Sequence, residues 1–206
     1  MKKNKFAYLL RGTPSALLCI GAGFVMASSA DLRAALGMGA AVLLAMLLSS
    51  ILISAIHSFI PVYAKMPTYL IIITGFVSII SMFMEAFFPV VVELLGVHLA
   101  ALAVSAVVYR DAEEIADHNG EATSIKTALV TGIFFTLIMV ICALFREVLG
   151  NASIFGQPIE FLQDYKISAL AGAFGGYLVL AIVLAVINKL TGLKVGEEKT
   201  EEKEDN

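Results

Sequence analysis

The side chains that could carry chemistry in this sequence are few and lie far apart. Cys19 and Cys142 are the two cysteines, and both lie in apolar segments, so no disulfide framework is indicated. His57 and His98 fall near the ends of apolar runs, where we expect interfacial histidines rather than metal ligands. Glu85 is an acid in an apolar region and thus a functional candidate, but its predicted position is close to the outer surface. The sequence shows no phosphate loop, nucleophilic serine arrangement or His/Glu metal motif, so it predicts no active site built from reactive side chains.

Small residues form a more informative pattern, in two segments that are short for membrane spans. The run 12–30 carries Gly21-Ala22-Gly23, and the run 94–109 is interrupted by Gly96 and is rich in alanine. Paired short or glycine-interrupted segments in the two halves of a chain indicate a site near the bilayer midplane. The residues expected to line this site are Gly21, Gly23, Ser105 and Ala106.

The elements that must position these residues are transmembrane helices. The chain has 206 residues, of which 59% are hydrophobic, and its mean hydropathy of +0.90 is far from that of a soluble domain. A spanning helix needs roughly 20 apolar residues. The sequence therefore predicts an all-α membrane protein with six transmembrane helices, at about 13–29, 34–56, 68–88, 92–109, 126–146 and 168–190. Residues 1–195 form a single predicted transmembrane domain, and residues 196–206 a disordered acidic cytoplasmic tail.

The basic residues predict the orientation of the chain. Six spans put both termini on one side, and a cytoplasmic N-terminus leaves only Arg33, Arg146 and Lys166 of the 14 Lys and Arg residues outside. The positive-inside rule thus predicts a multi-pass protein of the inner, cytoplasmic membrane of the cell, with both termini cytoplasmic. An alternative for the first 30 residues is a cleaved secretory signal, a pattern that Arg11 interrupts.

Three spans in each half predict an inverted-topology repeat, because two related halves with an odd number of spans must insert in opposite directions. Repeat one would cover about 12–89 and repeat two about 92–190. In this 3+3 arrangement, segments one and four are short or discontinuous half-helices that face each other. Small residues in both segments would let the two backbones approach closely.

Two loops carry charged residues. After the fourth span, Arg110 stands at helical spacing from Glu113 and Glu114, and this loop is either a solvated extension of the helix or a docking surface for a cytosolic partner. After the fifth span, Arg146 and Glu147 are expected in an interfacial loop, at the level of the lipid headgroups.

An ordered set of short stretches resembles a known family. The stretches are Ala34-Ala35-Leu36-Gly37-Met38-Gly39, Phe59-Ile60-Pro61 with Met66-Pro67, Glu93-Leu94-Leu95-Gly96-Val97, Asn119-Gly120, and Arg146-Glu147-Val148-Leu149-Gly150-Asn151 through Phe155-Gly156. Together they resemble the Rnf/Nqr integral membrane subunits, and the RnfE/NqrD branch most closely. The resemblance implies a six-helix inverted-repeat subunit of a complex that moves electrons between a cytosolic donor and acceptor while it pumps Na⁺ or H⁺. No catalysis is expected from this chain alone.

The resemblance also implies a cofactor and partners. In the family, this subunit and its sister, an RnfA/NqrE-like membrane protein, supply two cysteines each, and the four thiolates hold a 2Fe–2S cluster in mid-membrane. In this sequence the two cysteine positions fall at Gly23 and Ala106, and the nearest thiol is Cys19, one helical turn before Gly23. We therefore expect no cluster ligands in this chain, with flavins and iron–sulfur clusters carried by partner subunits, and the lipid bilayer rather than nucleic acid around it.

Two other functions remain open at this stage. The chain could be a stand-alone secondary transporter or channel that uses the same inverted repeat, with small residues leaving room for an ion or solute. It could also be a structural or assembly subunit without a transport path.

Overall fold

The computed structural model describes residues 21, 23, 25, 28–113, 121–158 and 168–191. Cys19, Glu114, the acidic tail 196–206, the possible signal segment before residue 21 and most of the first predicted span lie outside these residues. The described chain is helical except for one short antiparallel pair, β1 (Ser153–Ile154) and β2 (Gln157–Pro158).

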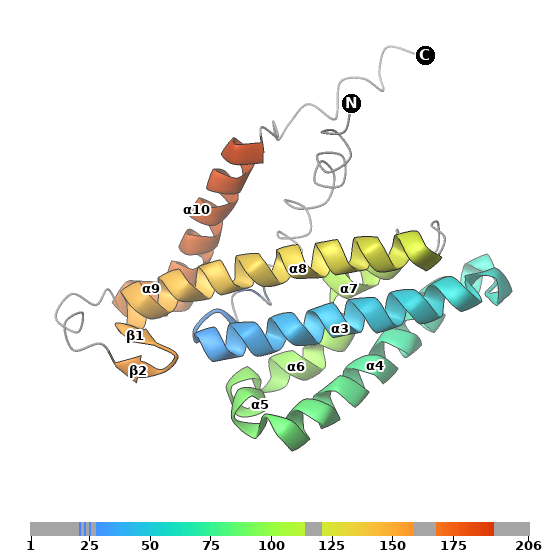
Figure 1. Ribbon diagram of the computed structural model, residues 1–206, viewed down its shortest axis with the longest axis horizontal. Helices are drawn as coiled ribbons and strands as arrows, with labels where there is room; N and C mark the ends of the chain where they lie inside the picture. The colour runs from blue at the N-terminus through green and yellow to red at the C-terminus, as the bar shows by residue number, and fades with distance from the viewer. Residues whose placement is uncertain are drawn as a thin grey trace, which may run out of the picture.

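Three long apolar helices form the body of the fold: α3 (Leu32–Ile56), α4 (Lys65–Phe87) and α8 (Glu121–Arg146). Their positions agree with the second, third and fifth predicted spans to within a few residues, except that α8 begins earlier. In the described part of the chain, three helices are long and apolar enough to cross a membrane, and a bent pair makes a fourth candidate. Figure 1 shows α3 lying between α8 and α4, as the contacts of α3 also indicate. The chain is thus a multi-pass membrane protein.

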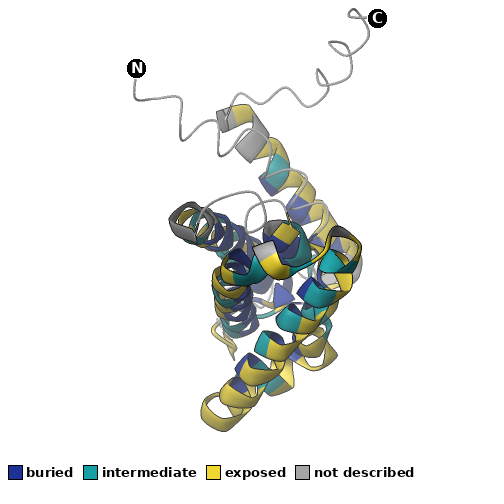
Figure 2. Cartoon of the chain, turned by 90° about the vertical axis from the view of Figure 1, so that its right-hand side faces the viewer, coloured by how far each residue is buried: buried dark blue, intermediate teal, exposed yellow. Residues whose placement is uncertain are grey.

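Helices α3 and α4 differ in how much of their surface the bundle covers. Buried residues occur on several sides of α3, whereas α4 buries only one stripe, Tyr69, Ile73, Val77, Ile80 and Met84. This stripe has the spacing of one helical face. The other faces of α4 expose large apolar side chains such as Ile71, Met82 and Phe83. Figure 2 draws exposed residues in yellow, and they cover much of the outer surface of the helices. An apolar surface of this kind is suited to lipid.

The pairing of α3 with α8 depends on small residues at the helix contact. A Cβ atom at Gly39 would overlap the side chain of Thr136, whose hydroxyl donates a hydrogen bond of 3.1 Å to the Gly39 carbonyl. A Cβ at Gly132 would stand 3.3 Å from the Leu43 backbone. Close packing matters here because lipid tails are as apolar as the side chains and leave little hydrophobic drive for helix association.

The fourth predicted span is a broken helix. It consists of α5 (Pro89–Leu95), α6 (Val97–Ala101), the 3₁₀ turn η3 (Leu102–Val104) and α7 (Ala106–Asp111). The parts on either side of Gly96 are bent by 76°. We refer to residues 89–111 as the broken span.

The chain after α8 forms a compact end, which we call the hairpin end. Here α8 continues into a one-turn π-helix, η5 (Glu147–Asn151), followed by the β1–β2 hairpin, whose turn is Phe155-Gly156. The sixth predicted span is two helices, α9 (Ser168–Ala171) and α10 (Ala173–Thr191), interrupted at Gly172. Figure 1 shows α10 projecting away from the other helices. Two 3₁₀ turns, η1 (His57–Phe59) and η2 (Val62–Ala64), join α3 to α4 at the opposite end.

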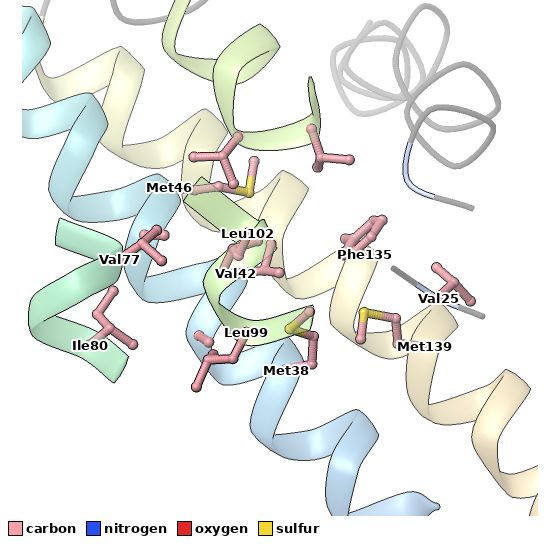
Figure 3. Packing of buried hydrophobic residues seen from close by; sticks show 14 of the residues in the cluster. Val25, Met38, Val42, Met46, Val77, Ile80, Leu99, Leu102, Phe135 and Met139 are labelled. Atoms are coloured by element: carbon pink, nitrogen blue, oxygen red, sulfur yellow. The ribbon is translucent and has the colours of Figure 1, made fainter. Parts of the chain in front are cut away.

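The core lies where α3, α4, α8 and the broken span meet. Figure 3 shows Met38, Val42 and Met46 of α3 beside Leu99 and Leu102 of the broken span, and all five are buried. The core thus fixes one face of the broken span against the long helices.

Candidate functional site

The break at Gly96 is a consequence of backbone conformation. Gly96 has φ 51° and ψ −132°, a combination that residues with a Cβ rarely adopt. Its N–H still bonds to the Val92 carbonyl and closes α5, but no helical ladder continues beyond it. The sequence therefore placed this interruption correctly, since glycine is the residue that such a bend requires.

The broken span has an inward and an outward side. Leu95, Leu99 and Leu102 are each 1% exposed and anchor the inward side in the core. On the outward side, Val97 is 80% and Val104 is 74% exposed. We call this outward side of residues 96–106 the open face. It combines irregular backbone with uncovered apolar side chains.

Ser105 starts the last helix of the broken span. Its backbone is extended, with φ −67° and ψ 123°, and its hydroxyl accepts a hydrogen bond of 3.3 Å from the N–H of Val107. This is the geometry of a helix N-cap. The side chain is buried, so the structure gives Ser105 a capping role at α7, one residue before Ala106.

Gly21 brings the first segment against the broken span. Gly21 is buried, and a Cβ there would stand 2.6 Å from the Phe135 ring and 2.9 Å from the Val107 side chain. Only a glycine fits this crossing without moving its neighbours. The contact with Val107 agrees with the expectation that segments one and four approach each other.

Gly23 and Ala106 lie on the other side of these segments. A Cβ at Gly23 would meet nothing within 4 Å, and both residues are exposed. The two positions that the family resemblance assigns to cysteines therefore face away from the packed core of this chain.

The described residues do not fit an iron–sulfur cluster. Gly23 and Ala106 carry no thiol, and the one donor beside them, the Ser105 hydroxyl, already caps α7. Cys142 is 1% exposed within α8 and packs in the core. Among the residues that the structure describes, no group of three or more His, Cys, Asp or Glu could hold a metal ion.

The other predicted candidates lie away from the open face or have local roles. Each histidine bonds through Nδ1 to a carbonyl three residues earlier, His57 to Ser54 at 2.7 Å and His98 to Leu95 at 3.2 Å. Glu85 is exposed near the end of α4. Arg110 and Glu113 follow at the end of α7 and just beyond it, and Glu113 is exposed.

The sequence reasoning missed a second site, the buried pair Arg146 and Glu147. We expected both at the headgroup level, but they are 3% and 2% exposed. The Arg146 guanidinium donates to the Ser29 hydroxyl at 2.6 Å and to the carbonyls of Ala171 and Gly172 at 3.0 and 3.3 Å. It thereby binds two carbonyl oxygens at the interruption between α9 and α10, of which that of Gly172 also accepts from the Gly176 N–H at 3.3 Å.

Glu147 performs the complementary task at the start of α3. One carboxylate oxygen accepts from the Leu32 N–H at 2.7 Å, and the other accepts from the Gly156 N–H at 2.7 Å. A negative charge at a helix N-terminus is electrostatically favourable, as is a positive charge at a C-terminus. Hydropathy alone could not reveal this arrangement because two of the partners, Ser29 and Leu32, are more than a hundred residues away in sequence.

Comparison with known proteins agrees with this architecture. The family model described as "Rnf-Nqr subunit, membrane protein" matches residues 2–191. The chain is 30% identical over 186 residues to the E subunit of the Na⁺-translocating ferredoxin:NAD⁺ oxidoreductase complex of Acetobacterium woodii, covering 90% of this chain and 95% of that protein. It is 30% identical over 193 residues to the E subunit of an ion-translocating oxidoreductase complex of Methanosarcina acetivorans, covering 90% and 91%. The corresponding E subunit from Shewanella frigidimarina is 29% identical over 157 residues, covering 76% and 68%. The chain therefore belongs to the Rnf-Nqr family of membrane protein subunits.

Proposed function

We propose that this chain is the E-type membrane subunit of an Rnf-like, redox-driven complex that translocates Na⁺ or H⁺. The names of the relatives support this assignment, since the similarity extends over 90% of this chain in the first two. The observation that carries it is the open face, because a solitary protein has no reason to expose a broken helix there.

The open face requires a protein neighbour. Irregular backbone at membrane depth is stable only when protein covers it or when it lines a water-filled cavity. The exposed side chains around the break, Val97 and Val104, are apolar and do not suit a water-filled cavity. We infer that a sister RnfA/NqrE-like subunit covers this face, with Gly23 and Ala106 near the contact.

The proposal includes the finer topology. Residues 1–195 form one domain of six spans arranged as a 3+3 inverted repeat, with both termini cytoplasmic. The crossing at Gly21 and the interruption at Gly96 support half-helices in segments one and four. Arg110, Glu113 and Glu114 would then lie on the cytoplasmic side as a docking loop for another subunit.

The role of this chain at the contact is to supply shape rather than ligands. With no thiol at positions 23 and 106, the residues of this chain contribute a close apolar surface beside the break. Flavins and iron–sulfur clusters belong to partner subunits in this account. Iron and acid-labile sulfide analysis of the purified pair checks this point, because one cluster per pair with ligands from this chain would contradict it.

Tagged purification from membranes tests the proposal. Ala106→Trp adds bulk on the open face and should abolish co-purification of a second membrane subunit. The matched control is Ile79→Trp on α4, where an equally bulky residue replaces a side chain that is 61% exposed, and co-purification should persist. Recovery of the unaltered chain only as a solitary homo-oligomer, with solute flux in liposomes and no redox partner, would favour the transporter instead.

A further inference from the structure

The charged pair at the hairpin end connects segments that the proposed function needs in fixed positions. Arg146 and Glu147 are adjacent in sequence, yet they bind different elements. Arg146 reaches Ser29, at the end of segment one, and the α9–α10 interruption. Glu147 reaches the first turn of α3 and the hairpin turn. Two further contacts reinforce the same end, from Asn151 Nδ2 to the Ala30 carbonyl at 3.4 Å and from Arg33 to the Phe155 carbonyl.

The hydrogen bond from Arg146 to Ser29 connects the hairpin end to segment one. The Ser29 N–H bonds to the Val25 carbonyl at 3.0 Å, so Ser29 closes the last turn of that segment. Val25 is 1% exposed, and Figure 3 shows it beside Phe135 and Met139 of α8. One helical turn earlier, Gly21 packs against Phe135 and Val107. Ser29, Val25 and Gly21 therefore form the inward face of segment one.

The same face determines where Gly23 lies. On this inward face Val25 packs beside Phe135 and Met139, but Gly21 has no side chain that would resist sliding along α7. A polar anchor that fixes the depth of the segment is then needed elsewhere. The 2.6 Å bond from Arg146 Nη1 to Ser29 Oγ is such an anchor, since a buried charged donor holds a hydroxyl more strongly than a neutral one.

We propose that Arg146 is a positioning residue that sets the depth of segment one relative to α7, and thereby the separation of Gly23 and Ala106, through its bond to Ser29. Glu147 supports this role by fixing η5 to the first turn of α3, so that Arg146 has a rigid base. The contacts of Arg146 and Glu147 do not depend on the proposed function. Only the effect of this positioning on the contact with a sister subunit rests on the proposed function.

The test measures a distance within this chain. Spin labels are attached at Gly23→Cys and Ala106→Cys in the full-length chain in lipid nanodiscs, with Cys19→Ser and Cys142→Ala to remove the native thiols. Both label sites are exposed, and a Cβ at Gly23 has open space around it. Pulsed electron paramagnetic resonance then gives the distribution of distances between the labels.

Ser29→Ala removes the hydroxyl that accepts from Arg146 and leaves the bonds of Arg146 to the Ala171 and Gly172 carbonyls in place. We expect the distance distribution to broaden and its maximum to move by up to about one helical turn, ~5 Å. Ser29→Thr keeps a hydroxyl and should restore the original distribution. Ser49→Ala is the matched control, because Ser49 is also buried but bonds only to carbonyls of its own helix, Ala45 and Met46.

An unchanged distribution in Ser29→Ala, or an equal change in Ser49→Ala, would overturn the proposal. If Ser29→Ala does not yield purified protein, labelling of Gly23→Cys in native membranes by a membrane-impermeant maleimide replaces the distance measurement. The labelling rate should then change at least threefold relative to the Ser29→Thr variant, and an equal rate would overturn the proposal. The nanodisc experiment contains no partner subunit. A negative result there would overturn the role of Arg146 but not the sister-subunit proposal, which the co-purification experiment tests separately.

Discussion

Helices are interrupted at both the broken span and the hairpin end, but the backbone groups at the two interruptions have different hydrogen-bond partners. At the hairpin end, two buried charged side chains bind the carbonyls of Ala171 and Gly172 and the N–H of Leu32. At the broken span, the cap is local, from Ser105 to Val107, and the outward side is open. The comparison teaches that this chain completes one interruption by itself, and we propose that a neighbouring subunit completes the other.

Among the substitutions considered, replacing Arg146 at the hairpin end should reduce the stability of the chain most. Arg146→Ala removes the donor to the buried Ser29 hydroxyl and to the carbonyls of Ala171 and Gly172, and the loss of a hydrogen bond from a charged group costs about 1.5–3 kcal/mol. We expect the variant to accumulate poorly and to aggregate at lower temperature in detergent, as measured by fluorescence-detected size-exclusion chromatography. Arg33→Ala, a matched arginine at the same end that is only half-buried, should lose far less stability. Equal losses in the two variants would show that burial of the pair is unimportant.

The crossing of segment one should be the next most sensitive position. Gly21→Val places methyl groups where Phe135 and Val107 already stand, and overpacking of this kind costs typically about 1–3 kcal/mol. Gly23→Val, two residues away at an exposed position with open space, should leave the thermal stability of the isolated chain unchanged. Phe135→Leu should partly restore the stability of Gly21→Val. If Gly23→Val destabilised the isolated chain more than Gly21→Val, the assignment of inward and outward sides would be wrong.

The bend at Gly96 should respond to any residue with a Cβ. Gly96→Ala meets no neighbouring atom, but it forces a side chain into a positive-φ conformation, at a cost of about 1–3 kcal/mol. The expected result is a lower melting temperature in detergent than for Gly75→Ala, an exposed glycine on α4 that also has open space around it. A melting temperature for Gly96→Ala at or above that of Gly75→Ala would contradict a conformational role for Gly96.

The cap of α7 should give the smallest effect. Ser105→Ala removes the acceptor for the Val107 N–H, and loss of an N-cap typically costs about 1 kcal/mol. Ser105→Asn keeps a capping oxygen and should retain most of the stability, again measured as melting temperature. A larger loss for Ser105→Asn than for Ser105→Ala would indicate that space, rather than capping, decides the residue at this position.

Much of the fold could be predicted from the sequence because long apolar runs report directly on spanning helices, as in α3, α4 and α8. The interruption at Gly96 was also predictable, because a glycine in a short apolar segment commonly marks a break in the helix. The interruption at Gly172 was missed because an isolated glycine is tolerated in helices. At this break the Arg146 side chain binds the carbonyls at positions 171 and 172.

The sequence did not predict which of the candidate site residues are packed and which are exposed. Composition placed Gly21, Gly23, Ser105 and Ala106 together as one lining. The structure separates them into a packed pair, Gly21 and Ser105, and an exposed pair, Gly23 and Ala106. This separation depends on how each segment is rotated about its own axis. The rotation follows from long-range contacts such as that of Gly21 with Phe135, which could not be predicted from the sequence alone.

The central claim, that another subunit completes the open face, is tested most directly by photo-crosslinking from position 106 in native membranes. A photoreactive amino acid at Ala106 should form a covalent adduct with a second membrane subunit of the same complex, while the same group at Ile79 on α4 should not. Adducts from position 106 that contain only lipid, or only a second copy of this chain, would contradict the account.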